Sequence, residues 1–227
     1  MKRIYIASTK PEDWQRLLAV PKGQWKSGFS AKALAYCWEN ADGFPKEIAR
    51  LFAESRIAAF QGIEALLILP EYKVQLPGHG KPSQNDVFVL AKAQGQLASI
   101  AVEAKVSEDF GPALENWCKE ASDGKKCRLA FLAEQLGLPQ NLPSDIRYQL
   151  LHRAASAVIE ARKFNAKSAV MLVHSFGQDE QSFEDYRAFV KLLGASVEQE
   201  QLVLAKHVQG TDLYCGWVTG DAKYLNV

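Results

Sequence analysis

The chain of 227 residues has almost no net charge, few cysteines and no long apolar run. Its formal charge is +1, so no global positive field indicates a nucleic-acid or membrane partner, and any anion site has to be local. The four cysteines form no Cys-x-x-Cys pair, which is typical of reduced thiols in a cytoplasmic protein. No segment approaches the roughly 18 apolar residues of a membrane span, and the N-terminus lacks the apolar stretch of a signal peptide. These absences predict a cytoplasmic protein without a membrane partner.

Several local signatures of catalysis and metal binding are also missing. The loop "PGHGKPSQN" does not satisfy the Gly-x-x-x-x-Gly-Lys-Ser/Thr pattern of a phosphate-binding loop, and no Gly-x-Ser-x-Gly motif occurs. The histidines show no zinc spacing, so we interpret them as scattered core or surface residues. They are His79, His152, His174 and His207.

The hydrophobic pattern predicts one α/β domain over residues 1–227, with a central mixed sheet flanked by helices. Residues 1–60 read as mostly helical, and three β-type runs, "ALLILPEYKV", "DVFVLAKA" and "LASIAVEAKV", open the sheet-containing part at 63–227. Helices then alternate with a continuous apolar strand, "SAVMLVHSF", and two further strands close the chain. The expected order is therefore α, β, β, β, α, β, α, β, β.

Two of these strands bring charged residues together. The runs that carry Asp86 and Lys105 are joined by a tight turn, and directly opposed residues of a hairpin share one side of the sheet. A turn at residues 95–96 would place Asp86 opposite Lys105, whereas a turn at 94–95 would place it opposite Glu103. In either register Asp86, Glu103 and Lys105 share a side, so we expect two carboxylates and an ammonium group close together.

Such a cluster is costly without a counter-ion, because two nearby carboxylates raise each other's pKa values. Mg²⁺, or Mn²⁺, prefers carboxylate and water oxygens and would neutralise the pair. A water activated by the metal and oriented by Lys105 could attack a phosphodiester. The alternative interpretation is structural: a charged rim of the sheet in which Lys105 bridges Asp86 and Glu103.

An Asp at the start of one strand and Glu-x-Lys in its partner, "Glu103-Ala104-Lys105", resemble the PD-(D/E)xK nuclease superfamily. The resemblance spans residues 30–176 and implies a restriction-endonuclease-like αβββαβ core with an N-terminal helical extension. It further implies a Mg²⁺-dependent nuclease in which Asp86 and Glu103 bind the metal and Lys105 positions the attacking water.

Members of this superfamily often add a glutamate from the first helix. Glu39 is our candidate over Glu47 and Glu54, although Glu71 could take its place if its strand lies beside Asp86. The same triplet pattern also occurs around Glu71, in "Glu71-Tyr72-Lys73", but the hairpin register favours residues 103–105.

The remaining candidates concern the substrate, expected to be nucleic acid and preferably DNA. In the loop before Asp86 we select Lys81, Ser83 and Gln84 as phosphate contacts. The helix from residue 146 has a polar side, which we interpret as solvated, although Arg147 and Gln149 could contact the substrate. That polar side consists of Gln149, Arg153, Ser156 and Glu160.

The near-neutral charge requires a local basic stripe or a homodimer that pools charge. The stripe we consider runs through Lys73, Lys81, Lys92 and Arg147. The five tryptophans lie mostly at helical or strand positions typical of a core, and Trp25 and Trp217 are the alternative candidates for base stacking. The alternative function is a catalytically inactive binding or assembly module with the same fold and a structural acid–lysine cluster. A third is a hydrolase of another kind that uses the hairpin as scaffold.

Overall fold

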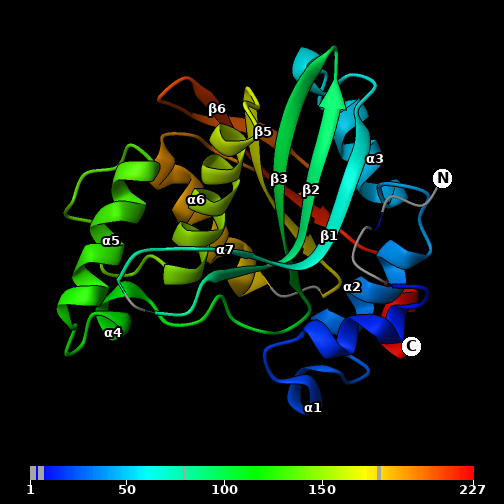
Figure 1. The fold of residues 1–227 in the computed structure, drawn as a ribbon, viewed down its shortest axis with the longest axis horizontal. Coiled ribbons are helices and arrows are strands. Elements are labelled where there is room, and N and C mark those ends of the chain that lie inside the picture. The colour runs from blue at the N-terminus through cyan, green and yellow to red at the C-terminus, as the bar shows by residue number, and fades with distance from the viewer. Residues whose placement is uncertain (1–3, 5–7, 79, 178–179) are drawn as a thin grey trace.

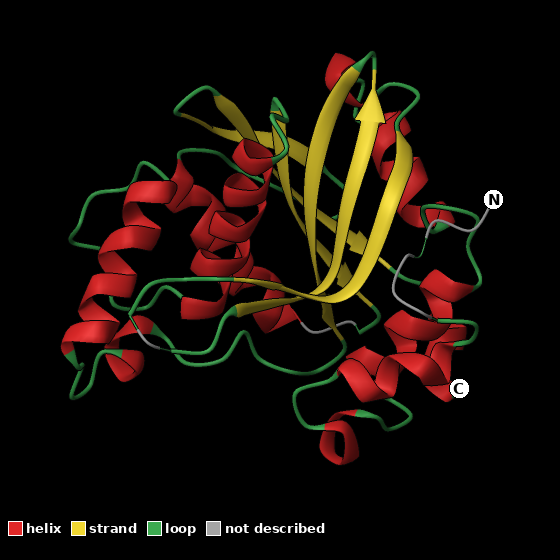
Figure 2. Ribbon diagram, viewed as in Figure 1, coloured by secondary structure: helices red, strands yellow, loops and turns green. Residues whose placement is uncertain are grey.

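The computed structural model describes residues 4, 8–78, 80–177 and 180–227 and shows a sheet with helices on both sides (Figure 1). Helices α5, α6 and α7 lie on one side, and α2 and α3 on the other (Figures 1 and 2). The predicted α/β class with a mixed sheet is confirmed. His79 lies outside the described residues. No helix in the described ranges is long and apolar enough to cross a membrane.

Within the described residues the sheet has six strands, in the order β1-β2-β3-β4-β6-β5. β1, β2 and β3 form an antiparallel meander, β3–β4 and β4–β6 are parallel, and β5 pairs antiparallel with β6. The helix that crosses from β3 to the parallel strand β4 is α6, as a βαβ connection requires. The strand bounds are Glu64–Val74 (β1), Ser83–Ala93 (β2), Gln96–Lys105 (β3), Ser168–Ser175 (β4), Leu202–Val208 (β5) and Thr211–Thr219 (β6).

The helices follow the expected order, with shorter pieces at the N-terminus. The segment "PEDWQRL" forms a 3₁₀ helix, η1. The α-helices are Pro21–Gln24 (α1), Ser30–Glu39 (α2), Lys46–Glu54 (α3), Leu114–Trp117 (α4), Asp123–Gln135 (α5), Tyr148–Lys163 (α6) and Glu180–Leu193 (α7). The 3₁₀ helices are Pro11–Leu17 (η1), Ala58–Phe60 (η2) and Ala222–Asn226 (η3).

The turn between β2 and β3 decides the register of the hairpin. Ala93 pairs with Gln96, so the two turn residues are Gln94 and Gly95, the second of the two predicted registers. Their φ angles are +49° and +76°, and a two-residue turn with both φ positive matches the twist of the flanking strands. The pairing continues to Val87 and Val102, so the next position places Asp86 opposite Glu103.

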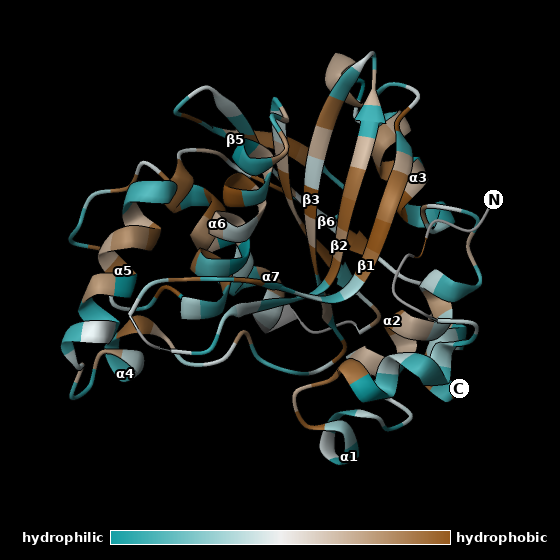
Figure 3. Cartoon of the chain, in the orientation of Figure 1, coloured by the Kyte–Doolittle hydropathy of each residue, from teal (hydrophilic) through white to brown (hydrophobic). Residues whose placement is uncertain are grey.

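The sheet separates two hydrophobic cores, which explains its buried strands. Figure 3 shows hydrophobic residues along the middle of β1, β2 and β3. Alternate strand residues such as Val87 and Ile100 pack with α2 and α3, whereas Ala101 and Met171 pack with α5, α6 and α7. The side of β3 that meets α6 is also the side that carries Glu103 and Lys105, so α6 forms a wall next to these charges.

Candidate functional site

Three adjacent strands each contribute one carboxylate to a single cavity of about 350 Å³. Glu71 comes from β1, Asp86 from β2 and Glu103 from β3, at the end of the sheet opposite the Gln94–Gly95 turn. The register pairs Pro70 with Val87 and Tyr72 with Asn85, which places Glu71 opposite Asp86. Residues between Leu18 and Ala31 form another wall of the cavity, so the N-terminal segment covers the strand ends.

Glu103 is buried and surrounded by donors. Its Oε1 accepts hydrogen bonds from Lys105 Nζ at 2.8 Å and Gln149 Nε2 at 2.7 Å, while its Oε2 accepts one from Arg153 Nε. Burial alone would raise the pKa of Glu103, but the two cations lower it to about 2. Glu103 is therefore the ionised anchor of the cluster.

Lys105 is held from three directions. Its ammonium group donates to Glu103 and, at 3.2 Å, to Gln149 Oε1, and it lies 4.8 Å from the centre of the Phe110 ring. The Lys105 side chain is 6% exposed, so these contacts replace most of its hydration. Lys105 lines the carboxylate cavity with a fixed position.

The carboxylate of Asp86 has fewer hydrogen-bonding and charged partners than that of Glu103. Its Oδ2 accepts a hydrogen bond from the Ala104 backbone N–H at 2.7 Å, and its Oδ1 lies 3.9 Å from Arg153 Nη2. Burial and the negative charge of Glu103 raise the pKa of Asp86 to about 7, because Arg153 is engaged mainly by Glu103. Asp86 is thus predicted to keep its proton well above the usual range of an aspartate.

Glu71 is the carboxylate that the sequence left as an alternative. Its backbone has φ +53°, a left-handed conformation that is rare for a residue other than glycine. Its Oε2 accepts a hydrogen bond from Gln84 Nε2 at 2.7 Å. Burial, followed by repulsion from Asp86, raises the pKa of Glu71 to about 8. Glu71 and Asp86 together form a pair that resists ionisation unless positive charge is added.

The polar side of α6 faces this cluster, and our interpretation of it as solvated is wrong. Arg153, Ser156 and Glu160 are buried, and Gln149 is half-buried. Glu160 accepts a hydrogen bond from the Tyr72 hydroxyl, so this side of α6 also contacts β1. Amphipathic spacing located this side correctly, but the charged strand ends that it covers belong to a distant part of the chain.

Two of the selected loop residues have structural contacts. Ser83 is buried, and its hydroxyl lies 2.8 Å from His152 Nδ1 and 2.8 Å from Ser156 Oγ, so it joins β2 to α6. Gln84 lines the carboxylate cavity and joins Glu71 to the Leu17 carbonyl. Lys81 lines a neighbouring cavity instead.

Other predicted residues lie elsewhere. Glu39 does not line the carboxylate cavity, and its carboxylate accepts hydrogen bonds from Trp14 Nε1, at 2.8 Å, and from Ser8. Arg147 forms an ion pair with Asp185 at 2.8 Å. Helix α2 presents Glu39 to the 3₁₀ helix η1, which sequence patterning did not place against it. Glu54 is exposed at the end of α3.

Most of the tryptophans lie in the core, as expected, with Trp14, Trp38 and Trp217 buried. Trp217 is buried in the core beside Phe110, Phe183 and Tyr186, so it is not exposed for base stacking. Trp25 is half-buried against the core on the α2 side. Its place outside the carboxylate cavity gives no support for a stacking role.

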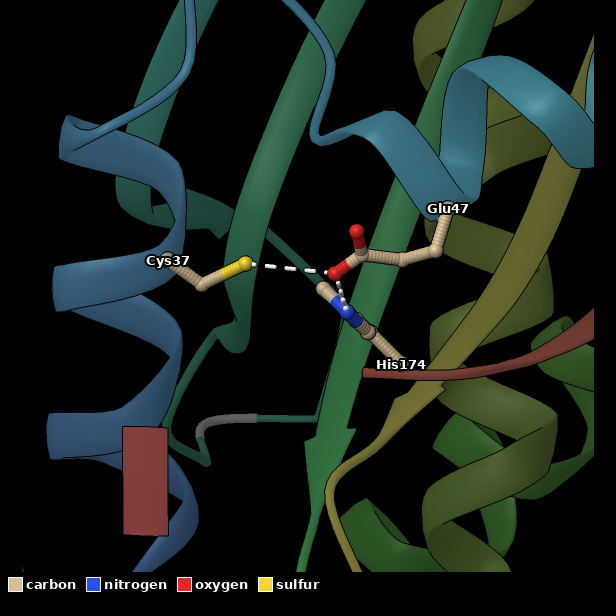
Figure 4. Close-up of side chains that lie close together, drawn as sticks. All are labelled: Cys37, Glu47 and His174. Carbon is tan, nitrogen blue, oxygen red and sulfur yellow. Dashed lines mark hydrogen bonds and ion pairs between the residues drawn. The ribbon is translucent and has the colours of Figure 1, made fainter. Parts of the chain in front are cut away.

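A second group of potential ligands lies on the other side of the sheet. Cys37 from α2, Glu47 from α3 and His174 from β4 converge (Figure 4), and their ligand atoms lie within 4.8 Å of one another. Glu47 Oε1 is 3.3 Å from Cys37 Sγ and 3.0 Å from His174 Nε2. Burial would raise the pKa of Glu47, but the His174 hydrogen bond brings it below its usual value.

The hydrogen bonds of this group argue against a metal. The Trp38 indole N–H, which can only donate, lies 3.4 Å from His174 Nδ1. His174 therefore carries its proton on Nε2 and donates it to Glu47. A histidine that bound a metal through Nε2 would need its proton on Nδ1, facing an acceptor rather than an indole N–H. We interpret this group as a buried polar link between α2, α3 and β4.

The fold and the cavity define an α/β protein with an open mixed sheet and a carboxylate cluster at one end of its antiparallel meander. The chain belongs to the family described as a domain of unknown function (DUF6946), whose model matches residues 7–222. Comparisons with curated proteins and with solved structures give no match.

Proposed function

We propose that the chain is a cytoplasmic, divalent-cation-dependent nuclease that hydrolyses phosphodiester bonds at the carboxylate cavity. The observation that carries the proposal is the combination of Asp86 and Glu71 in one cavity with pKa values raised to about 7 and about 8. Buried carboxylates perturbed by their neighbours in a cavity are typical of functional sites. The resemblance of Asp86, Glu103 and Lys105 to the PD-(D/E)xK pattern supports the same reaction class.

The donor atoms of the cavity fit a hard cation, with one change from the sequence-based assignment. Both oxygens of Glu103 already accept hydrogen bonds from protein donors. Asp86 and Glu71 each use only one oxygen in a hydrogen bond to a described residue. Asp86 and Glu71 would therefore hold Mg²⁺ or Mn²⁺ together with waters, and Glu103 would join only if Arg153 moved.

A bound cation would supply a polarised water and neutralise developing charge on the phosphoryl oxygens. Lys105 would orient the phosphodiester or the attacking water, because its ammonium group is fixed by Glu103 and Gln149 beside the same cavity. Glu103 holds Lys105 in position through their contact at 2.8 Å. Arg153 sets the charge of the cluster by neutralising Glu103, which leaves the negative charge of the ionised Asp86 and Glu71 for the cation.

A second candidate function is favoured by one observation. Glu103 makes hydrogen bonds with three side-chain donors of the chain itself, as expected of a structural ion cluster. In that case the chain would be a binding or assembly module, and the cavity would neither bind a divalent cation nor cleave nucleic acid.

Calorimetric titration of Mg²⁺ or Mn²⁺ into the wild type and Asp86→Asn separates the two functions. Asparagine keeps an acceptor for the Ala104 N–H but removes the negative charge. We expect the wild type to bind the cation and Asp86→Asn to lose most of this affinity. Asp145→Asn, at an exposed position, is the matched control and should bind like the wild type.

The pH dependence tests the site more specifically. Near pH 6 cation binding should release protons from Asp86 and Glu71, and the release should vanish well above about pH 8. Nicking of supercoiled plasmid should rise over the same range and be lost in Asp86→Asn. Equal titration heats for wild type and Asp86→Asn at high pH, with no nicking, would overturn the nuclease proposal and support the module.

A further inference from the structure

We propose that a basic groove next to the carboxylate cavity binds the phosphates that flank the scissile bond of a nucleic-acid strand, through Lys73 and Lys81. This inference rests on the proposed function, because it assigns the substrate's path at the same site. The groove is a cavity of about 660 Å³ that shares Gln84, Lys105 and Arg153 with the carboxylate cavity.

The charges of the groove are those that a phosphate strand requires. Lys73 and Lys81 line it and are exposed, and neither ammonium group bonds to another residue in the described ranges. Lys105 and Arg153 also line it but are engaged by Glu103. Asp109 is the opposing charge in the groove wall. Among the described residues that line the groove, the two lysines are therefore the cations available to neutralise a ligand, whereas the adjoining cavity is rich in carboxylates.

The loop that carries Lys81 packs against α5 and accepts hydrogen bonds from it. Arg128, which is buried, donates hydrogen bonds to the backbone carbonyls of Pro77 at 2.9 Å and Lys81 at 2.8 Å. A Cβ on Gly78 would lie 2.1 Å from the Gly124 carbonyl oxygen, so this approach requires glycine. Figure 1 shows the ends of β1 and β2 extending toward α5. The position of Lys81 is thus set by contacts rather than left to an unattached loop.

The groove and the carboxylate cavity together describe a path for a strand with several phosphates. One phosphodiester would lie beside Lys105, where the two cavities meet, and its neighbours would lie beside Lys81 and Lys73. A net charge of only +1 is compatible with phosphate binding here, because the positive charge of Lys73 and Lys81 is concentrated in the groove. Arg147 and Lys92, which the sequence suggested for a basic stripe, do not line this groove.

The test is the binding of a short fluorescein-labelled oligothymidylate, measured by fluorescence anisotropy in EDTA over a series of NaCl concentrations. EDTA prevents cleavage, so binding is measured separately from nuclease activity. Lys73→Ala and Lys81→Ala should each weaken binding by about fivefold. Each should also reduce the slope of log K against log salt by about 0.7, because one phosphate contact is lost.

Two matched variants separate the groove lysines from other charged residues. Lys92→Ala removes an exposed lysine from the same strand pair but outside the groove, and should bind like the wild type. Asp109→Asn removes the opposing charge and should strengthen binding. If Lys73→Ala and Lys81→Ala bind like Lys92→Ala, or if the wild type does not bind, the groove assignment is wrong. If Asp86→Asn loses nicking while the lysine variants bind the oligonucleotide like the wild type, the proposed nuclease function stands and only the groove assignment is wrong.

Discussion

Asp86→Asn should make the folding stability less dependent on pH, and its effect should change with pH in a defined direction. The folded-state pKa of Asp86 is about 7 against an ordinary value of 3.8. Between these values the unfolded chain has lost the proton while the folded chain keeps it, so the wild type loses stability as the pH rises. Above about pH 7 both states are ionised and the loss is complete.

The magnitude follows from the size of the shift. A difference of about three pH units, at about 1.4 kcal/mol per unit, corresponds to on the order of 4 kcal/mol. The Asp86 side chain is 22% exposed, so solvent screening removes only part of this figure. Asp86→Asn should therefore be more stable than the wild type by a few kcal/mol at about pH 8, and nearly equal to it at about pH 4.

Urea unfolding in EDTA, followed by circular dichroism at several pH values, measures this difference. Asp145→Asn serves as the control, because this exposed carboxylate does not line the cavity. Mg²⁺ should restore wild-type stability at about pH 8 and have little effect on Asp86→Asn. Parallel stability curves for the wild type and Asp86→Asn between about pH 4 and pH 8 would refute the reasoning from burial and the neighbouring Glu103 charge.

Three further predictions concern the rest of the cluster and the fold. Arg153→Met leaves Glu103 buried without its main partner, so it should lower the free energy of unfolding in urea by about 3–5 kcal/mol. A loss below about 1 kcal/mol would contradict the buried pair. Gly95→Ala, at φ +76°, should cost about 1 kcal/mol by the same assay, and a neutral effect would argue against the turn. Native Cys127, which is exposed, should react rapidly with a thiol reagent, whereas Cys37, whose pKa is raised by burial, should react only on unfolding; equal rates would contradict its burial.

The hairpin shows what sequence patterning could predict about the site. A strand alternates its side chains with a period of two, so any two-residue turn places Asp86 and Glu103 on the same side. The structure confirms the register with Gln94 and Gly95 in the turn. The alternating and apolar runs also predicted the strand order along the chain, because local periodicity reflects which side of each element is buried.

Contacts between distant segments could not be predicted in the same way. Glu71 enters the cavity because β1 pairs with β2 and because its own backbone adopts a left-handed conformation, and neither feature has a signal in the triplet around it. Arg153 contacts Glu103 across 50 positions of sequence. Glu39 is a glutamate on an early helix, as the resemblance implies, but α2 directs its carboxylate to Trp14.

The sequence by itself determined the α/β class, the hairpin and the shared side of Asp86, Glu103 and Lys105, since these depend on periodicities within one or two neighbouring elements. Only the tertiary structure decided which carboxylate oxygens accept no hydrogen bond from a described residue, which cations neutralise Glu103 and where the basic groove lies. Those features depend on how α6 and the loop beside α5 pack against the strand ends, and packing energies depend on residues far apart in the chain.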